Sequence, residues 1–336
     1  MKNKILKFID LFAGIGGFHL ALSSLGLQCV YSNDYDKYAQ VTYRENFGEI
    51  DGTDIKSINE TKIPKFDILC GGFPCQPFSI AGVSKKNSLG RKHGFEDEKQ
   101  GNLFFEIIRI INFHKPPILF LENVKNLKSH DNGNTWKVIM KELDNAGYYV
   151  FSKIVDGKYY VPQHRERVYI ICFRKEVFPE IDFQFPIYPK KRIYELKDVF
   201  EKFVDKKYTL SDKLWKGLQR HKDNSSAKGS GFGFGLIDPK VDEYTRTISA
   251  RYHKDGSEIL IKQENQNPRR LTPRECARIQ GFPESFKIPV SNTQAYRQFG
   301  NSVVMPAIKA TAEQILKTVK EYEKGGARAE QTKLFK

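Results

Sequence analysis

Cys75 stands in a segment, GGFPCQPFS, in which glycines and prolines keep the backbone irregular. The apolar run FDILC comes just before it and predicts a buried strand. Ligands of α/β proteins bind where such strands end. Most lone cysteines are inert core thiols, which is our interpretation of Cys29, Cys70 and Cys172. For Cys75 we instead predict an accessible thiol that could act as a nucleophile in its thiolate form.

A second candidate site is the turn Gly14-Ile15-Gly16-Gly17, between the apolar FIDLF and the helix-forming FHLALSSLG. Such a turn leaves free backbone N–H groups at a helix start, where a nucleotide-like ligand can approach. Asp34 follows Gly14 by 20 residues, where a carboxylate commonly binds ribose hydroxyls. The dinucleotide fingerprint needs a glycine where His19 stands, which favours S-adenosylmethionine (AdoMet) over NAD. A plain tight turn is the alternative interpretation.

The elements that must position these residues alternate along the first half of the chain. The predicted strands are FIDLF, LQCVYSN, FDILCGG, PPILFLENV and RVYIICF, and the predicted helices are FHLALSSLG, LFFEIIRIINFH and TWKVIMKELDNAGY. This alternation predicts an α/β fold with a mostly parallel, Rossmann-like sheet. After Phe173 prolines and charges break the pattern, and KGSGFGFG near position 230 cannot form a regular helix.

The change in pattern predicts two domains. We expect a catalytic and cofactor-binding domain at 1–189 and a smaller, irregular, largely β domain at 190–290. Helical patterning returns in a C-terminal segment, 291–325, which we expect to pack on the first domain. We expect residues 326–336 to form a flexible tail.

Charge and cysteine content limit the classes of function. The 336 residues include 55 Lys+Arg and 40 Asp+Glu, and the formal net charge of +15 favours a polyanionic partner, nucleic acid first. The five cysteines are an odd number without a CxxC pair, so neither a disulfide framework nor a metal site is predicted. Without an apolar run of membrane length or a secretory signal, we expect a cytoplasmic protein that does not contact membranes.

Six segments in a fixed order resemble the motif series of the bacterial DNA cytosine-5 methyltransferases. They are FIDLFAGIGGF, GGFPCQPFS, FLENVKNL, VPQHRERVYII, RRLTPRECARIQGFP and QAYRQFGNSVVMPAI. The resemblance covers nearly the whole chain, and six ordered motifs are far more specific than any one of them. It implies an AdoMet-dependent enzyme that methylates C5 of a cytosine flipped out of double-stranded DNA, with a target-recognition domain. It also implies a monomer and allows for a partner restriction endonuclease.

The resemblance assigns chemistry to four residues. Cys75 matches the nucleophile that adds to C6 of cytosine, which makes C5 reactive. Glu122 matches the acid that donates a proton or hydrogen bond at N3, a role that requires a raised pKa. Arg165 and Arg167 match residues that orient the carbonyl oxygen of the flipped base and the catalytic loop. The alternatives are a capping or ion-paired acid and a pair of solvated arginines.

The resemblance also implies binding residues. The cofactor pocket would draw on Phe12, Gly14, Gly16, Asp34, Tyr35, Asp54, Ile55, Leu103 and Asn301. Tyr35 stands where relatives often have tryptophan, and it still permits stacking on an adenine. Contacts to DNA are expected from Lys85, Lys86, Arg91, Lys228, Arg246, Arg251 and Lys254. For the basic segment after Cys75, an ordinary solvated loop is the alternative.

Three segments together resemble the Dcm and EcoRII-type enzymes: GVSKKNSLGRKHGF after Cys75, KGSGFGFGLIDP and TRTISARYHKDGSEILI. This resemblance implies methylation of the second cytosine of CCWGG, where W is A or T. A related specificity such as CCNGG and a tRNA cytosine-5 methyltransferase of the same fold are the alternatives.

Overall fold

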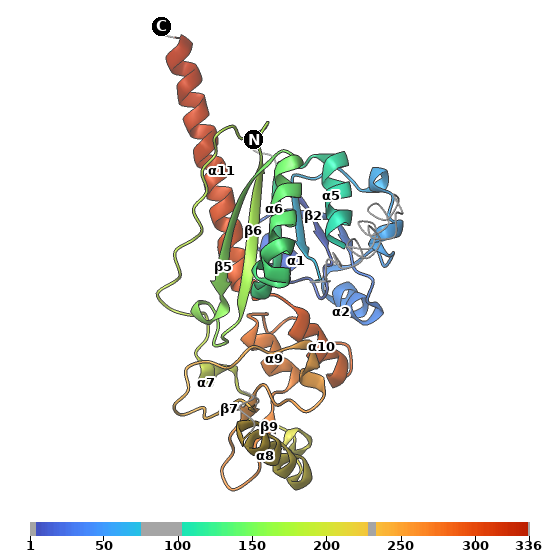
Figure 1. Cartoon of the computed structure of the whole chain (residues 1–336), viewed down its shortest axis with the longest axis vertical. Helices are drawn as coiled ribbons and strands as arrows, with labels where there is room; N and C mark the ends of the chain where they lie inside the picture. The colour runs from blue at the N-terminus through green and yellow to red at the C-terminus, as the bar shows by residue number, and fades with distance from the viewer. Residues whose placement is uncertain (1–4, 75–102, 228–232, 335–336) are drawn as a thin grey trace.

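The computed structural model describes residues 5–74, 103–227 and 233–334. Its larger part is built on a six-stranded sheet with the strand order β2-β1-β3-β4-β6-β5 (Figure 1). The strands are β1 (Lys7–Leu11), β2 (Gln28–Asn33), β3 (Ile68–Gly72), β4 (Ile118–Val124), β5 (Tyr148–Asp156) and β6 (Glu166–Arg174). The pairs among β1 to β4 are parallel, whereas β6 runs antiparallel to β4 and β5. The predicted α/β fold with a mostly parallel sheet is confirmed.

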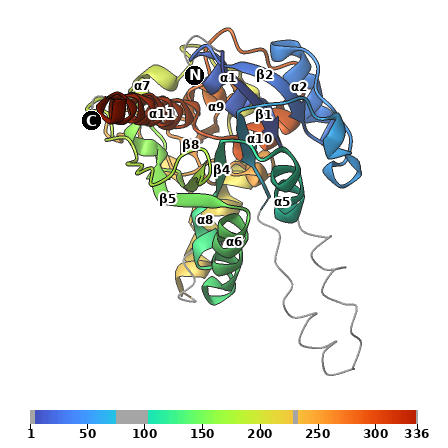
Figure 2. The same cartoon turned by 90° about the horizontal axis from the view of Figure 1, so that it is seen from above.

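Helices cover both faces of this sheet, as the view from above shows (Figure 2). They are α1 (Gly17–Ser23), α2 (Lys37–Phe47), α5 (Leu103–His114), α6 (Asn134–Asn145) and α11 (Met305–Leu334). Successive side chains of a strand point to opposite faces, so Phe8 packs in the apolar cluster under α1 and α11, and Ile9 in the cluster under α5 and α6. The strands β1, β3, β4 and β6 are buried on both faces over most of their length, which explains why they are largely continuous apolar runs.

Two elements of the larger part are not apparent in the sequence pattern. The strand β5, at the edge of the sheet, is half-buried over much of its length and reads as the mixed sequence YYVFSKIVD. The helix α2 buries Thr42 as well as Ala39 and Tyr43, so its apolar face is interrupted by polar side chains. Its start does carry a local signal, because the Asp36 side chain accepts hydrogen bonds from the backbone N–H groups of Tyr38 and Ala39.

The smaller part lies beyond the carboxyl edge of the sheet and is irregular (Figure 1). It contains β7 (Leu236–Ile237), β8 (Leu260–Ile261), β9 (Arg269–Arg270), α7 (Leu196–Val199), α8 (Asp212–Ala227) and α9 (Pro273–Ile279). The three strands form one sheet, in agreement with the expected β content, but each has only two residues. The longest element is α8, with 16 mostly polar residues that give a weak apolar pattern.

The helix α10 (Asn292–Asn301) joins the two parts of the molecule. Its Phe299 lies in one apolar cluster with Ile279 of α9 and with Ile15 of the glycine turn. The sequence predicts that 291–325 returns to the larger domain; within this segment, α11 packs along α1.

The helix α11 continues through Leu334, across most of the segment predicted to be a flexible tail. The helix continues past the glycine pair Gly325-Gly326, because most of the residues in the ARAEQTKL that follows are good helix formers. In Figure 1 this end of α11 projects away from the sheet. None of the described helices combines the length and apolarity needed to cross a membrane.

Candidate active site

A cavity of about 660 Å³ lies at the carboxyl edge of the sheet, where β1, β3 and β4 end and α10 approaches. Most of the described residues that the sequence assigned to catalysis or to the cofactor line it. They are Phe12, Gly14, Asp34, Tyr35, Asp54, Ile55, Leu103, Glu122, Arg165, Arg167 and Asn301. Parallel strands bring their carboxyl ends to one edge, so segments far apart in the sequence meet there.

The glycine turn forms one wall of the cavity. Phe12 and Gly14 both have a φ of 56°, so the chain turns sharply after β1. The backbone N–H of Gly14 donates to Asp34 Oδ2 at 2.7 Å, and the N–H of Asp36 donates to the other oxygen of Asp34 at 2.8 Å. Each carboxylate oxygen keeps a lone pair for a ligand hydroxyl. Burial raises the pKa of Asp34.

Gly16 is not among the residues that line this cavity. Its φ is 81°, and a Cβ atom there would lie 2.2 Å from the ring of Phe47 on α2. The structure therefore gives Gly16 a packing role at the start of α1, where the helix and α2 approach closely.

The other predicted cofactor residues offer chemically different groups. Tyr35 exposes 72% of its surface, which leaves its ring available, and Ile55 is buried. The Asp54 side chain accepts the N–H of Lys56, while Leu103 begins α5 and Asn301 ends α10. An accessible ring, apolar side chains and two carboxylates fit an adenosine group, with hydroxyls for the carboxylates and a base for the ring and the apolar wall.

Glu122 and Arg167 form an ion pair in the same cavity. Glu122 is buried near the end of β4, and Arg167 stands opposite Val124 in the antiparallel pair of β4 and β6. This register brings Arg167 Nε to 3.1 Å from Glu122 Oε1. Burial raises the pKa of Glu122, although the positive charges of Arg167 and Arg165 oppose the rise. The direction is the one that a proton donor requires.

Arg165 is also buried, but its hydrogen bonds go to the backbone. Nη1 donates to the carbonyl of Ile248 at 2.8 Å, and Nη2 donates to those of Gly300 and Ser302 at 2.9 and 2.6 Å. Nε has no hydrogen-bond partner among the described residues. Arg165 therefore differs from Arg167, since it joins three backbone segments where Arg167 reaches Glu122.

Asn123 is a site residue that the sequence reasoning missed. Its Nδ2 donates to the carbonyl of Phe73 at 2.8 Å, and its side chain is buried. Phe73 and Pro74 follow β3, and both line the cavity. Asn123 thus ties the end of β4 to the start of the loop that leads to Cys75. Its place beside Glu122 in one motif was the signal that could have identified it.

Several predicted residues lie outside the described part of the chain. They are Cys75, Lys85, Lys86, Arg91 and Lys228. The three predicted DNA contacts that are described, Arg246, Arg251 and Lys254, are exposed on the smaller part. None of these three has a carboxylate partner within the described residues, and Arg246 Nη1 donates to the carbonyl of Gly233 at 3.1 Å.

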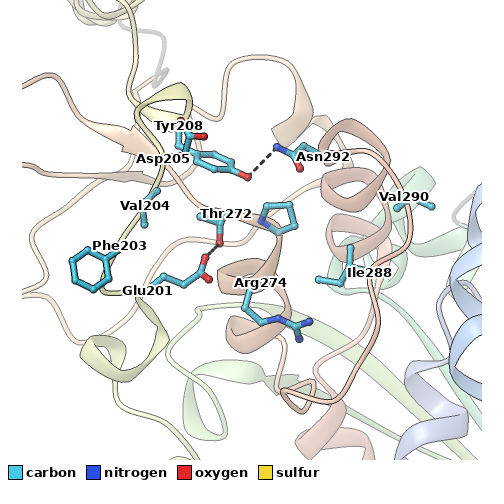
Figure 3. A pocket seen from close by; sticks show the side chains of 11 residues that line it. Glu201, Phe203, Val204, Asp205, Tyr208, Thr272, Arg274, Ile288, Val290 and Asn292 are labelled. Atoms are coloured by element: carbon cyan, nitrogen blue, oxygen red, sulfur yellow. Dashed lines mark hydrogen bonds between the residues drawn. The ribbon is translucent and has the colours of Figure 1, made fainter.

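A second cavity, of about 310 Å³, lies in the smaller part (Figure 3). Its polar side chains bond to one another or to the backbone. Asn292 donates to the hydroxyl of Tyr208 at 3.0 Å, and Thr272 donates to Glu201. Arg274 Nη2 donates to a backbone carbonyl at 2.7 Å. With these groups already engaged, the larger cavity is the stronger candidate for chemistry.

Comparison with known proteins settles the family. The family model for C-5 cytosine-specific DNA methylase matches residues 6–317. The chain belongs to this family. It is 49% identical over 317 residues to the type II methyltransferase M.DsaV of Dactylococcopsis salina, covering 94% of this chain and 87% of the relative. It is 44% identical over 374 aligned positions to the DNA-cytosine methyltransferase of Escherichia coli (strain K12), covering 94% and 78%.

Solved structures agree on the fold. The Entamoeba histolytica methyltransferase EhMeth superposes with a TM-score of 0.73 at 20% identity, covering 94% of this chain and 99% of that one. The predicted enzyme class is therefore confirmed: this is a DNA cytosine-5 methyltransferase of the kind found in type II restriction–modification systems. Family and fold imply AdoMet as the methyl donor and DNA as the substrate. The roles of individual site residues remain predictions.

Proposed function

We propose that this methyltransferase acts on the second cytosine of CCWGG in duplex DNA, through a covalent bond between Cys75 and C6 of the flipped base. The cavity at the carboxyl edge supports this proposal most directly. It is lined by the buried Glu122 with Arg167, by every predicted cofactor residue except Gly16, and by Pro74, which directly precedes Cys75. One cavity thus brings together the groups that we propose as proton donor and methyl-donor site, next to the residue that precedes the proposed nucleophile.

The reaction makes a different demand on each side chain. The Cys75 thiolate adds to C6, and the electron pair of the C5–C6 bond moves toward N3 through the ring. Protonated Glu122 donates at N3 and stabilises this charge, and Arg167 lies close enough to hold the Glu122 side chain in place. AdoMet would supply the methyl group when bound: C5 takes the methyl as the bond from the methyl carbon to sulfur breaks, S-adenosylhomocysteine leaves, and Glu122 recovers the proton at N3. Water then accepts the C5 proton, the electron pair of the C5–H bond re-forms the C5–C6 double bond, and cleavage of the Cys75–C6 bond restores the thiolate and the aromatic base.

The base must leave the helix stack for this chemistry, because stacked neighbours block the face of the ring that Cys75 attacks. Contacts to the DNA offset this cost. The exposed Arg246, Arg251 and Lys254 are suitable donors to phosphates or to guanine edges. Lys85, Lys86, Arg91 and Lys228 complete the proposed contact set on sequence grounds.

The decisive experiment is bisulfite sequencing of a plasmid incubated with purified enzyme and AdoMet. Methylation of the second cytosine confined to CCWGG supports the proposal, and the plasmid should then resist a restriction endonuclease that cleaves this site. Spread to CCSGG, where S is C or G, would favour CCNGG. Methylation at a site without a CC step contradicts the proposed target. A parallel assay with labelled AdoMet and tRNA tests the alternative substrate.

A further inference from the structure

The segments Pro162–Arg165 and Thr245–Ile248 lie side by side and link the two parts of the molecule; we call this pair the interdomain seam. Gln163 and Thr245 form a parallel β-bridge. The N–H of His164 donates to the carbonyl of Thr245 at 2.8 Å, and the N–H of Thr245 donates to the carbonyl of Pro162 at 2.9 Å. We call Thr245–Ile248 the recognition segment. It thus pairs with Pro162–Arg165 of the larger part in a single register.

Two buried side chains strengthen the seam. Gln163 Oε1 accepts the N–H of Ile248 at 2.9 Å, while its Nε2 donates to the carbonyl of Ile279 at 2.9 Å. The Arg165 guanidinium donates to the carbonyl of Ile248 itself and to the carbonyls of Gly300 and Ser302. Gln163 is fully buried and Arg165 nearly so. Burying such groups is costly unless they are hydrogen-bonded, so they hold these backbone segments firmly.

The seam connects the surface with the predicted DNA contacts to the cavity that contains Glu122. Arg246 lies within it, and Arg251 lies just after it in the 3-10 helix η7 (Ala250–His253). Arg167, which pairs with Glu122, comes two residues after Arg165. The backbone of α10 also packs closely against the backbone that follows the seam: a Cβ atom on Gly300 would lie 2.2 Å from the carbonyl carbon of Ser249. Recognition, cofactor and proton-donor segments are therefore fixed to one another through a few bonds.

We propose that Gln163 and Arg165 are positioning residues that fix the register between the recognition segment and Glu122. In this way they determine which base of the bound sequence reaches the cavity. The proposal rests on the proposed function, since it requires recognition of DNA by the smaller part. It assigns Arg165 a role through the backbone, in place of the contact to the base carbonyl that the family resemblance implies.

Four variants of the full chain test the proposal. Gln163→Met and Arg165→Lys loosen the seam. Tyr148→Phe and Arg274→Lys are matched controls outside it: the buried Tyr148 hydroxyl donates to the carbonyl of Pro116 at 2.8 Å, and Arg274 donates to the carbonyls of Pro283 and Phe286. We measure kcat and KM on duplex DNA, the Kd for AdoMet, and methylation at sites that differ from the preferred one by a single base.

For both seam variants we expect kcat at saturating DNA to fall about tenfold or more, because small displacements of reacting groups are costly. The ratio of methylation at one-base variants to that at the preferred site should rise about fivefold or more, since the register is looser. The Kd for AdoMet should stay within about threefold in Gln163→Met, because the Gln163 side chain bonds to Ile248 and Ile279 and not to the segment around Asn301. The controls should change neither kcat nor the ratio.

Folded seam variants with unchanged kcat and fidelity would overturn the proposal. So would a rise in the Kd for AdoMet that accounts for the whole loss of kcat. If these variants do not fold, Thr247→Val carries the same test, because it removes one seam bond, from Thr247 Oγ1 to the carbonyl of His164 at 2.5 Å. A wild-type enzyme that methylates no DNA would instead contradict the proposed function.

Discussion

The carboxyl edge of the six-stranded sheet and the smaller part of the chain are built by different means. At the edge, buried strands end together, and their register places Glu122 and the glycine turn at one cavity. In the smaller part the strands have two residues each, and the fold depends on side chains that bond to the backbone. An example is the buried Glu275, whose carboxylate accepts the backbone N–H groups of Glu201 and Thr272, both at 2.9 Å. Regular register suits chemistry that needs fixed atoms, and irregular loops suit the readout of a variable ligand.

This comparison predicts a difference in sensitivity. Changes of one or two atoms in Cys75 or Glu122 at the sheet edge should cost most of the activity, because we propose that these two groups act on the reacting bonds. Changes of charge on the smaller part should act gradually, because many weak contacts share the binding energy.

The largest effect is expected for Cys75→Ser. A serine hydroxyl is a far weaker nucleophile than a thiolate, so methyl transfer should fall by about a thousandfold or more. AdoMet and DNA should still bind, since little packing changes. Single-turnover assays with labelled AdoMet, together with DNA-binding titrations, measure both. Turnover within about tenfold of the parent would rule out the covalent role of Cys75.

The next largest effect is expected for Glu122→Gln. The amide keeps the size of the side chain but cannot donate the proton of an acid, so kcat should fall about a hundredfold or more. Glu106→Gln is a matched control, because Glu106 is also buried and also pairs with an arginine, Arg109, at 2.8 Å. It lies on α5 outside the cavity, and its rate should stay near that of the parent. Equal losses in both variants would show that Glu122 is structural.

The raised pKa of Glu122 adds a test by pH. The acid form is the active one, so the rate of the chemical step should fall as the pH rises through the pKa of Glu122 in the folded enzyme. The Glu122→Gln variant should lack this decline. A single-turnover rate that rises over the same range in the parent would mean that the carboxylate is the active form.

The contrast between the sheet edge and the smaller part is also a contrast in how well the sequence predicts their structure. The strands ending at Gly72 and Val124 are apolar runs followed by motifs, so both their existence and their meeting at one edge follow from the pattern. Asp34 and Gly14 lie side by side because both belong to one strand–turn–helix–strand unit, which the sequence pattern does predict. Gly16 shows the limit of a motif: its packing against Phe47 depends on α2, which the pattern does not reveal.

The seam is a harder case, because nothing local predicts which carbonyls Arg165 will meet. Its partners Ile248 and Gly300 lie 83 and 135 residues away in the sequence. The helix α8 escapes prediction for the opposite reason, since its exposed surface is polar and only a narrow face with Leu218 is buried. Long-range hydrogen bonds and weakly patterned helices dominate the smaller part, which is why its detail could not be derived.

A graded effect is expected when charge is removed from the exposed surface of the smaller part that carries Arg246, Arg251 and Lys254. The triple variant Arg246→Gln, Arg251→Gln and Lys254→Gln should weaken DNA binding and reduce the slope of log affinity against log salt by about two to three units. The matched control replaces three exposed lysines of α11 with glutamine: Lys317, Lys320 and Lys324. Affinity measured from low to moderate salt should separate the two proteins. Identical slopes would show that the three predicted contacts do not reach phosphates.

The smallest effect on catalysis is expected for Asp10→Asn, beneath the catalytic edge. Asp10 is fully buried in β1; its Oδ2 accepts the N–H of His19 at 3.2 Å, and its Oδ1 has no partner among the described residues. Burial raises the pKa of Asp10 to about 8, from an ordinary value of 3.8. Its neighbour His19 has a pKa lowered to about 4 and stays neutral above it. Asp10 is therefore the group of this pair that titrates near neutral pH.

The sign follows from proton binding. Between the unfolded and folded pKa values of Asp10, the folded state holds a proton that the unfolded state has lost, so stability falls as the pH rises through this range. Asparagine keeps an acceptor for the His19 N–H and removes the titration. The quantity to compare is the free energy of unfolding of the variant minus that of the parent. We expect this difference to be about 1–3 kcal/mol more favourable to the variant at pH 9 than at pH 5. Urea titrations of both proteins from pH 5 to 9 measure this, and parallel profiles would mean that the folded enzyme carries Asp10 as an anion.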